Sequence, residues 1–152
     1  MDIRFFDRDL RLIRVIDEYV ACIFHQKWTD YGSFEIHMDR MDQKLLRAGN
    51  YVLIGGDGKK SGRIEYVSAS DEDDGKAVAK GHTLLFLLTQ RITVPPAGHA
   101  YHTFRAPAGD IIRALVRANA VDAADPARNF PLLAIGESLG RGQVLYYQSR
   151  YA

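Results

Sequence analysis

Short apolar strands separated by glycine-containing turns are the feature that most constrains the fold of this chain. Residues 34–38 alternate apolar and polar side chains, which is typical of a strand with one buried face. Residues 19–28 are apolar on both faces, so we expect a long strand at the centre of a sheet. Polar tips at 55–60 and 71–75 join further strands into hairpins. This pattern predicts an antiparallel β-barrel or sandwich built from hairpins.

An apolar run at residues 83–90 interrupts the β pattern. It contains Leu84, Leu85, Leu87 and Leu88, too many leucines for the single apolar stripe of a surface helix. We expect a short helix that is buried against the barrel or plugs its end. Prolines at 95 and 96 then break the chain. We therefore expect a β-barrel domain at residues 1–94.

Residues 95–152 are expected to form a smaller segment of one helix and a pair of strands. Pro107 suits the first position of a helix, and Asp110 complements the helix dipole in the first turn. Residues 132–135 and 143–147 are predicted to form the final strand pair. This segment either packs on the barrel or begins a second domain. The predicted fold class is thus mainly β with short helices (α+β).

Charge and cysteine content narrow the classes of function. The 152 residues carry 20 basic and 19 acidic side chains, for a net charge of +1, which gives no support to a large nucleic-acid footprint. Cys22 is the single cysteine, so no disulfide forms within the chain. No signal peptide is visible, and the most apolar run is far shorter than the ~20 residues of a membrane span. We expect a protein made in a cytoplasm, without a membrane anchor.

Two loops each resemble a ligand-binding motif, but each lacks residues that its motif requires. Residues 55–61 lack the glycine that precedes Lys-Ser in a phosphate loop, and they open no helix. We therefore interpret them as a hairpin tip. The acidic tip around Asp71, Asp73 and Asp74 lacks the first carboxylate and the final glutamate of an EF-hand. Weak calcium binding by these carboxylates stays open.

No combination of residues predicts a catalytic centre, a cofactor site or a metal site. Cys22 and His25 lie at odd spacing on one expected strand, so their side chains point to opposite faces. His99 and His102 have no third ligand for zinc. Nothing in the sequence brings the carboxylates of Glu35 and Glu65 together. A small enzyme that uses Cys22 or the histidines is kept as a third hypothesis, after the two given at the end of this section.

The end of the chain is the candidate interface. Tyr146, Tyr147, Arg150 and Tyr151 lie close together in the sequence, and tyrosine and arginine are favoured at protein interfaces. Ordinary packing of a last strand is the alternative, and the two interpretations stay open.

An ordered series of landmarks runs along the chain. It opens with the sequence FDRDLRLI at residues 6–13 and ends with an Arg-x-x-Pro-x-Leu element. Between them come a tryptophan, a Gly-Ser-Phe-Glu strand, a Leu-x-x-Gly turn, a Gly-x-Ile-Glu strand and a Gly-x-x-Leu helix that ends in arginine. These are Trp28, Gly32 to Ile36, Leu46 to Gly49, Gly62 to Glu65, Gly81 to Leu84, Arg91, and then Arg128, Pro131 and Leu133. The series resembles the hub proteins at the tail tip of long-tailed, siphovirus-type bacteriophages, which are related to the baseplate hubs of contractile tails.

This resemblance implies a structural virion or prophage protein. Family members are usually longer, so the chain corresponds to an amino-terminal portion of a hub or to a short relative. The resemblance implies a ring, expected to be a trimer, that contacts itself and neighbouring tail proteins in the virion tail after assembly in the host cytoplasm. It brings no catalytic residue to this chain. The alternative is a small β-barrel that binds single-stranded nucleic acid.

Overall fold

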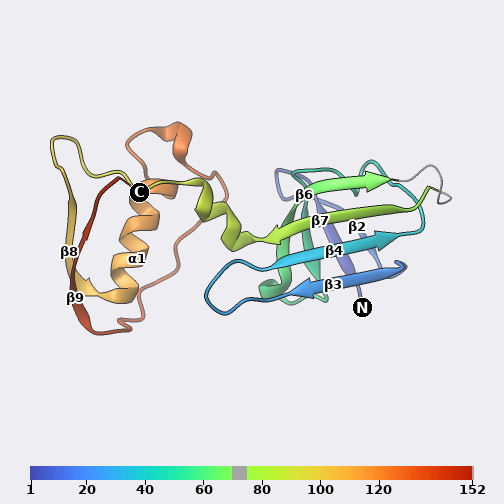
Figure 1. The fold of residues 1–152 in the computed structure, drawn as a ribbon, viewed down its shortest axis with the longest axis horizontal. Helices are drawn as coiled ribbons and strands as arrows, with labels where there is room; N and C mark the ends of the chain where they lie inside the picture. The colour runs from blue at the N-terminus through green and yellow to red at the C-terminus, as the bar shows by residue number, and fades with distance from the viewer. Residues whose placement is uncertain (70–74, 152) are drawn as a thin grey trace. The chain divides into compact units, whose positions relative to one another are not determined.

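One antiparallel sheet of seven strands forms the first unit of the chain, Met1–Phe86 (Figure 1). The computed structural model describes residues 1–69 and 75–151. The strand order in the sheet is β2-β1-β5-β6-β7-β4-β3. The strands are β1 (Ile3–Phe6), β2 (Leu12–Ile16), β3 (Ala21–His25), β4 (Ser33–Met38), β5 (Tyr51–Ile54), β6 (Ser61–Ala69) and β7 (Ala77–Thr83).

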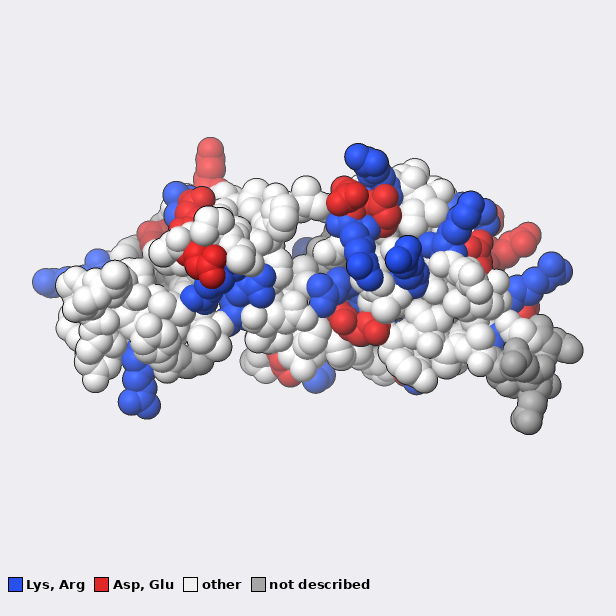
Figure 2. Space-filling view, turned by 90° about the horizontal axis from the view of Figure 1, so that it is seen from above, with Lys and Arg blue, Asp and Glu red and all other residues white. Residues whose placement is uncertain are grey.

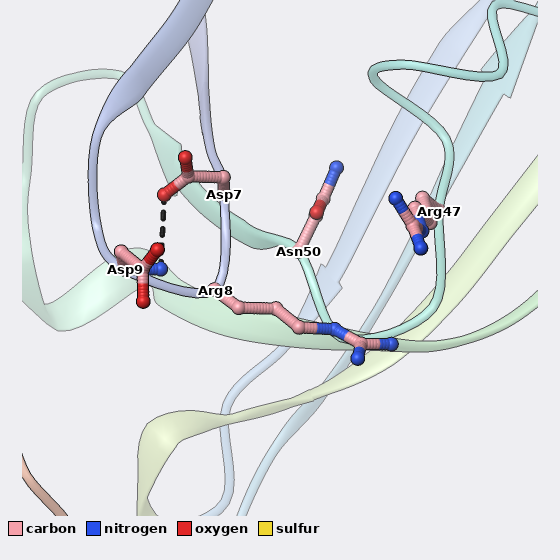
Figure 3. A pocket seen from close by; sticks show the side chains of 5 residues that line it. All are labelled: Asp7, Arg8, Asp9, Arg47 and Asn50. Atoms are coloured by element: carbon pink, nitrogen blue, oxygen red, sulfur yellow. Dashed lines mark hydrogen bonds between the residues drawn. The ribbon is translucent and has the colours of Figure 1, made fainter.

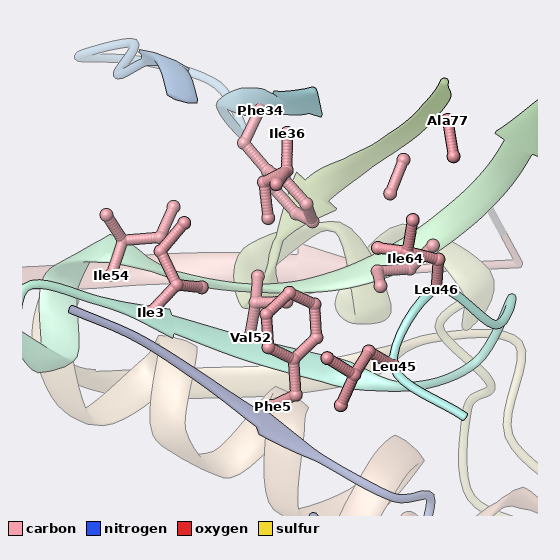
Figure 4. Close-up of a cluster of buried hydrophobic side chains, with 11 residues drawn as sticks. Ile3, Phe5, Phe34, Ile36, Leu45, Leu46, Val52, Ile54, Ile64 and Ala77 are labelled. Atoms are coloured by element: carbon pink, nitrogen blue, oxygen red, sulfur yellow. The ribbon is translucent and has the colours of Figure 1, made fainter. Parts of the chain in front are cut away.

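A single apolar cluster fills the first unit. Eleven buried residues form it, and Figure 4 shows Phe34 and Ile36 of β4 directed toward the side chains of Ile3 and Phe5 on β1. Strands near opposite ends of the sheet thus share one core, which requires the sheet to curve over itself. The buried cluster consists of Ile3, Phe5, Phe34, Ile36, Leu45, Leu46, Val52, Ile54, Ile64, Ala77 and Ala79.

Two of the landmark glycines make room for the ring of Phe34. A Cβ atom on Gly62 would lie 2.6 Å from Phe34 Cε1, and one on Gly81 would lie 2.6 Å from Phe34 Cζ. Both would also overlap the backbone oxygen of the neighbouring strand, because the Cβ positions lie 2.4 Å from His82 O and 2.0 Å from Arg63 O. Glycine at these positions therefore serves close packing inside the sheet.

The predicted barrel differs from the structure in two respects. The sheet is not closed, because β2 and β3 are its two edges, so the unit is sandwich-like. The prediction that residues 19–28 form a long central strand is wrong, since β3 spans only Ala21–His25 and, among the described strands, pairs with β4 alone. On the face of β3 away from the core, Ile23 is 42% exposed, and Trp28 lies beyond the strand and is 100% exposed. Here a strand with apolar residues on both faces lies at the edge of the sheet. Hydrophobic periodicity cannot distinguish such an edge strand from a central one.

The turns between strands agree with the residues that build them. Asp7 accepts hydrogen bonds from the backbone amides of Asp9 and Arg11, both at 2.9 Å, and so closes the turn between β1 and β2. Asp57 accepts from the Lys59 amide at 3.0 Å and starts the short 3-10 turn η1 (Gly58–Lys60). That turn connects the antiparallel strands β5 and β6, which confirms the hairpin-tip interpretation of residues 55–61. The acidic tip with Asp71, Asp73 and Asp74 lies outside the described residues.

The leucine-rich run forms a helix that is not buried. It is a 3-10 helix, η2 (Leu84–Gln90), in which no residue is buried. Leu84 and Leu85 are 39% and 53% exposed, so the expectation of a buried helix that plugs a barrel is wrong. Apolar content alone predicts a helix here, while burial depends on whether a tertiary partner covers all of its sides.

The second unit, Leu87–Ala152, is built on a two-stranded ribbon and one helix. The predicted boundary, after residue 94, lies eight residues beyond the division after Phe86 (94 − 86). Its elements are β8 (His102–Pro107), α1 (Ala108–Val116), the π-helical turn η3 (Arg117–Val121), the 3-10 turn η4 (Pro126–Arg128) and β9 (Val144–Ser149). The predicted helix is confirmed, with Asp110 in its first turn, but Pro107 ends β8 and occupies the N-cap position instead of the first helical position.

The predicted final strand pair is wrong. Residues 132–135 form no strand, and β9 pairs antiparallel with β8, from His102↔Ser149 to Pro107↔Val144. The partner of β9 thus lies about forty residues earlier in the chain, on the far side of α1. A strand that follows a helix can return to a strand that precedes it, and local hydrophobicity does not reveal that choice.

Candidate interface on the β8–β9 ribbon

The ribbon of β8 and β9 presents an unusually apolar surface to solvent. Every residue of β9 except Ser149 is exposed, including Val144 at 64% and Leu145 at 46%. Tyr146 and Tyr147 are 68% and 45% exposed, although successive strand residues point to opposite faces. Both faces of β9 are therefore open, which differs from a strand packed on a core.

The four residues predicted as an interface lie together on this strand or directly after it. Tyr146 and Tyr147 lie in the middle of β9, and Arg150 and the 67% exposed Tyr151 follow it. The Tyr146 hydroxyl is 2.9 Å from the amide Nε2 of Gln148, on the same face. Solvent-exposed tyrosines argue against the alternative of ordinary packing within this unit, because packing would have buried their rings.

A polar network, which the sequence pattern did not reveal, holds the remainder of the second unit. Arg91 Nε donates to the Arg128 carbonyl oxygen at 2.6 Å, and Arg128 donates to the Ile92 carbonyl oxygen at 2.6 Å. The buried side chain of Asn119 accepts from the Val94 amide and donates to the Leu115 carbonyl, both at 2.8 Å. Arg91 and Arg128 are both sequence landmarks, and their place in that series was the one indication in the sequence that they matter to the fold.

The aromatic side chain of Phe130 extends this network. The Arg91 guanidinium lies 4.0 Å from the centre of the Phe130 ring, a distance at which a cation is attracted to the ring face. The backbone amide of Phe130 donates to the Ala120 carbonyl at 2.8 Å. These contacts fix the loop after η4 against η3 and leave the ribbon as the open surface of the unit.

A second candidate is a small polar pocket in the first unit. Its volume is about 160 Å³, and it is lined by Asp7, Arg8, Asp9, Arg47 and Asn50. Figure 3 shows the carboxylates of Asp7 and Asp9 at one end and the guanidinium groups of Arg8 and Arg47 at the other. The Arg8 guanidinium donates to the Ala48 carbonyl at 3.1 Å. The lining of the pocket contains no Cys, Ser or His, and the Asp7 carboxylate is hydrogen-bonded to the backbone amides of Asp9 and Arg11.

The residues considered for catalysis are not brought together. Cys22 packs against the core while His25 is exposed, as their odd spacing predicted. Burial raises the pKa of the Cys22 thiol, which disfavours the reactive thiolate. Within the described residues, no three His, Cys, Asp or Glu side chains form a group that could hold a metal ion.

Glu35 and Glu65 are separated by a strand and have different partners. Glu35 lies on β4 and Glu65 on β6, with β7 between them. Glu35 accepts from Lys80 Nζ at 3.0 Å, and this bond is the main reason that its pKa is lowered. Glu65 accepts from Arg63 Nε at 2.7 Å. Both carboxylates form surface ion pairs, which is a structural arrangement and not a general acid–base pair.

His82, His99 and His102 lie in separate surroundings among the described residues. The ring centre of His102, on β8, lies 4.1 Å from that of Phe104, and its buried Nδ1 has no hydrogen-bond partner among the described residues. His99 lies in the turn before β8. His82 packs against Tyr31 and Phe86, with ring centres 5.0 and 4.5 Å away, and these two rings also lie 5.0 Å from each other. This aromatic cluster, missed in the sequence analysis, packs the start of η2 against β7.

Comparison with known families identifies the chain's relationship. Residues 2–152 match the family described as siphovirus ReqiPepy6 Gp37-like protein. The chain belongs to this family. Membership makes it a phage protein, as the landmark series indicated, and suggests a structural, virion-associated role. A comparison with curated proteins found no match. In the described part of the chain, no helix is long and apolar enough to span a bilayer.

Proposed function

We propose that this protein is a structural subunit of the phage tail tip, a hub protein that assembles into a ring and joins the tail tube to the tip. Membership of a siphovirus family over residues 2–152 is the observation that carries the proposal. The exposed tyrosines of β9 support it, because a part that works by assembly needs apolar surface outside its own core.

The proposed mechanism is interface complementarity and requires no catalytic step. A cyclic ring is closed by heterologous contacts, in which two different surfaces of the same subunit meet. A trimer is the ring order that we propose, with neighbouring tail proteins seated on its two faces. The ribbon supplies one surface of suitable chemistry, an aromatic centre with Arg150 at its border.

Light scattering tests this proposal directly. Solution mass is measured over a concentration series, for the chain alone and co-expressed with the flanking tail proteins. We expect a closed trimer, alone or on a partner ring. The Tyr146→Ala, Tyr147→Ala double variant should lose that assembly, and Ile112→Ala, which removes an exposed apolar side chain from α1, is the matched control. A monomer that ignores every tail protein contradicts the proposal.

The alternative of single-stranded nucleic-acid binding has less support. It was based on a small barrel with basic and aromatic strand residues, whereas the sheet is open. On the face shown in Figure 2, Lys and Arg side chains lie among Asp and Glu instead of forming an uninterrupted basic stripe. A salt-sensitive shift with oligonucleotide would favour this alternative, and absence of binding at low salt would exclude it.

A further inference from the structure

The described strands present four outer edges, and two of them carry features that prevent pairing with another chain. Opposite the Phe5/Phe6 step of β1, the edge strand β2 has a register shift, and its Arg14 forms an ion pair with Asp42 at 3.1 Å. The edge strand β8 contains Arg105 and ends in Pro107. Bulges, charged side chains and proline are the features by which natural sheets protect an edge.

The other two edges, β3 and β9, have none of these features. Ala21–His25 and Val144–Ser149 contain no charged residue, proline or glycine. Each pairs with its one neighbour in an unbroken register. In the described part of the chain no other strand pairs with either one. An edge of this kind is a template for strand addition by main-chain hydrogen bonds.

Each unit thus has one unprotected edge, and the two edges differ in sequence. A contact between different surfaces of identical subunits is heterologous, and such contacts close into rings. At one end of the two edges the flanking residues are both basic, Lys27 after β3 and Arg141 before β9, and Lys27 is already paired with Asp30 at 3.3 Å. At the other end the charges are complementary: Asp17 and Glu18 lie a few residues before β3, and Arg150 directly follows β9. None of these three side chains forms an ion pair with another described residue. Antiparallel alignment of β3 with β9 brings these opposite charges to the same end.

We infer that β9 of one subunit pairs antiparallel with β3 of a second copy of this chain. The register places Arg150 opposite Glu18, Tyr146 opposite Cys22 and Leu145 opposite Ile23. Exposed Leu145 and exposed Ile23 then cover each other, and the sheet of one copy continues into the ribbon of the next. This inference rests on the ring assembly proposed above and names its contact.

Cys22 provides a natural probe, because it is the single cysteine and lies on β3. Directly opposed strand residues have Cα atoms roughly 4.5–5.5 Å apart, which is within the range of a disulfide. Tyr146→Cys, oxidised at the assembly concentration, should give covalent links between chains. The same substitution combined with Cys22→Ala, and Ile112→Cys with native Cys22, should give none. Ile23→Cys with Leu145→Cys, in a Cys22→Ala background, tests the same register through an independent pair.

A charge exchange tests the alignment without a covalent bond. Glu18→Lys alone and Arg150→Glu alone should each weaken association, roughly fivefold for a loss of about 1 kcal/mol. The double variant should restore it, because the pair is re-formed with its signs reversed. Asp9→Lys, which reverses an exposed acidic residue in the turn between β1 and β2, is the matched control and should leave association unchanged.

The outcomes separate the two proposals. Chain-to-chain disulfides at both designed pairs, together with charge rescue, support the β3–β9 contact. A ring of the expected mass without disulfides at either pair overturns this contact and leaves the ring standing. Disulfides to a co-expressed tail protein, or within one chain, contradict the inference that the partner of β9 is a second copy of this chain. A persistent monomer overturns the ring and the contact together.

Discussion

Each of the two units is stabilised internally by a different kind of interaction. The first unit buries eleven apolar residues in one cluster, among them two phenylalanines and five isoleucine and valine side chains. The second buries only Ile111, Ala120 and Ala123 among its described apolar residues, and relies on hydrogen bonds of Arg91, Arg128 and Asn119. Apolar burial is the main favourable contribution to folding. The first unit therefore has the larger apolar core to stabilise it, whereas the second unit depends more on its hydrogen bonds.

The largest expected effect is in the core of the first unit. Phe34→Ala should lower the free energy of unfolding by about 3–5 kcal/mol, because it removes a fully buried ring and leaves a cavity beside two glycines. Urea denaturation followed by circular dichroism measures the change. Tyr66→Ala, at a 59% exposed side chain, is the control and should stay within about 0.5 kcal/mol. A loss below roughly 1 kcal/mol for Phe34→Ala would contradict the assigned core.

A smaller effect, confined to the second unit, is expected at Asn119. Asn119→Ala leaves the Val94 amide and the Leu115 carbonyl without their partner, which should cost about 1–3 kcal/mol. Hydrogen exchange of the α1 amides should accelerate while the amides of β5 and β6 keep their rates. Arg117→Ala, at an exposed neighbouring position, is the matched control. Equal acceleration in both units would show that they unfold together, and would contradict the claim that each unit is stabilised separately.

The ribbon should contribute little to the stability of the isolated chain. Tyr146→Ala and Tyr147→Ala should each change the free energy of unfolding by no more than about 0.5 kcal/mol, because both rings are open to solvent. Differential scanning calorimetry at low concentration measures this. A loss of several kcal/mol at either position would mean that the tyrosine packs within its own unit.

The smallest effect is at the Glu35–Lys80 ion pair on the first unit. The pKa of Glu35 is lowered in the folded chain, so its contribution is present above the ordinary value of 4.5 and is lost as the pH falls through the lowered value. Because both side chains are substantially exposed, we expect only a few tenths of a kcal/mol. A double-mutant cycle of Glu35→Gln and Lys80→Gln at pH 7 and pH 3 isolates the pair. Coupling that grows on acidification would contradict the assignment.

The sequence was sufficient where local rules decide the structure. The turn at Asp7, the hairpin tip at Asp57 and the helix after Pro107 all depend on short-range hydrogen bonds and on proline geometry. The odd spacing of Cys22 and His25 likewise predicted their separation to opposite sides of β3. Several of the family landmarks are residues that the packing requires, such as Gly62 and Gly81, which make room for Phe34.

Long-range choices could not be predicted in the same way. β3 has the pattern of a central strand, yet it is an edge, because neighbours are chosen by the whole sheet and not by the strand's own residues. β9 pairs across α1 with β8, and the leucine-rich η2 is only partly covered, for the same reason. The candidate interface residues Tyr146, Tyr147, Arg150 and Tyr151 were found by composition, but their exposure on both faces of a ribbon required the structure.

Residue-level hydrogen exchange on the full chain, first dilute and then at the concentration at which it assembles, tests the central claim most directly. At low concentration the amides of β5 and β6 should exchange slowly, while the β9 amides that do not face β8 should exchange at nearly unfolded rates. On assembly those β9 amides, and the outer amides of β3, should become protected together. Slow exchange of the outer β9 amides in a chain shown to be monomeric would contradict the account.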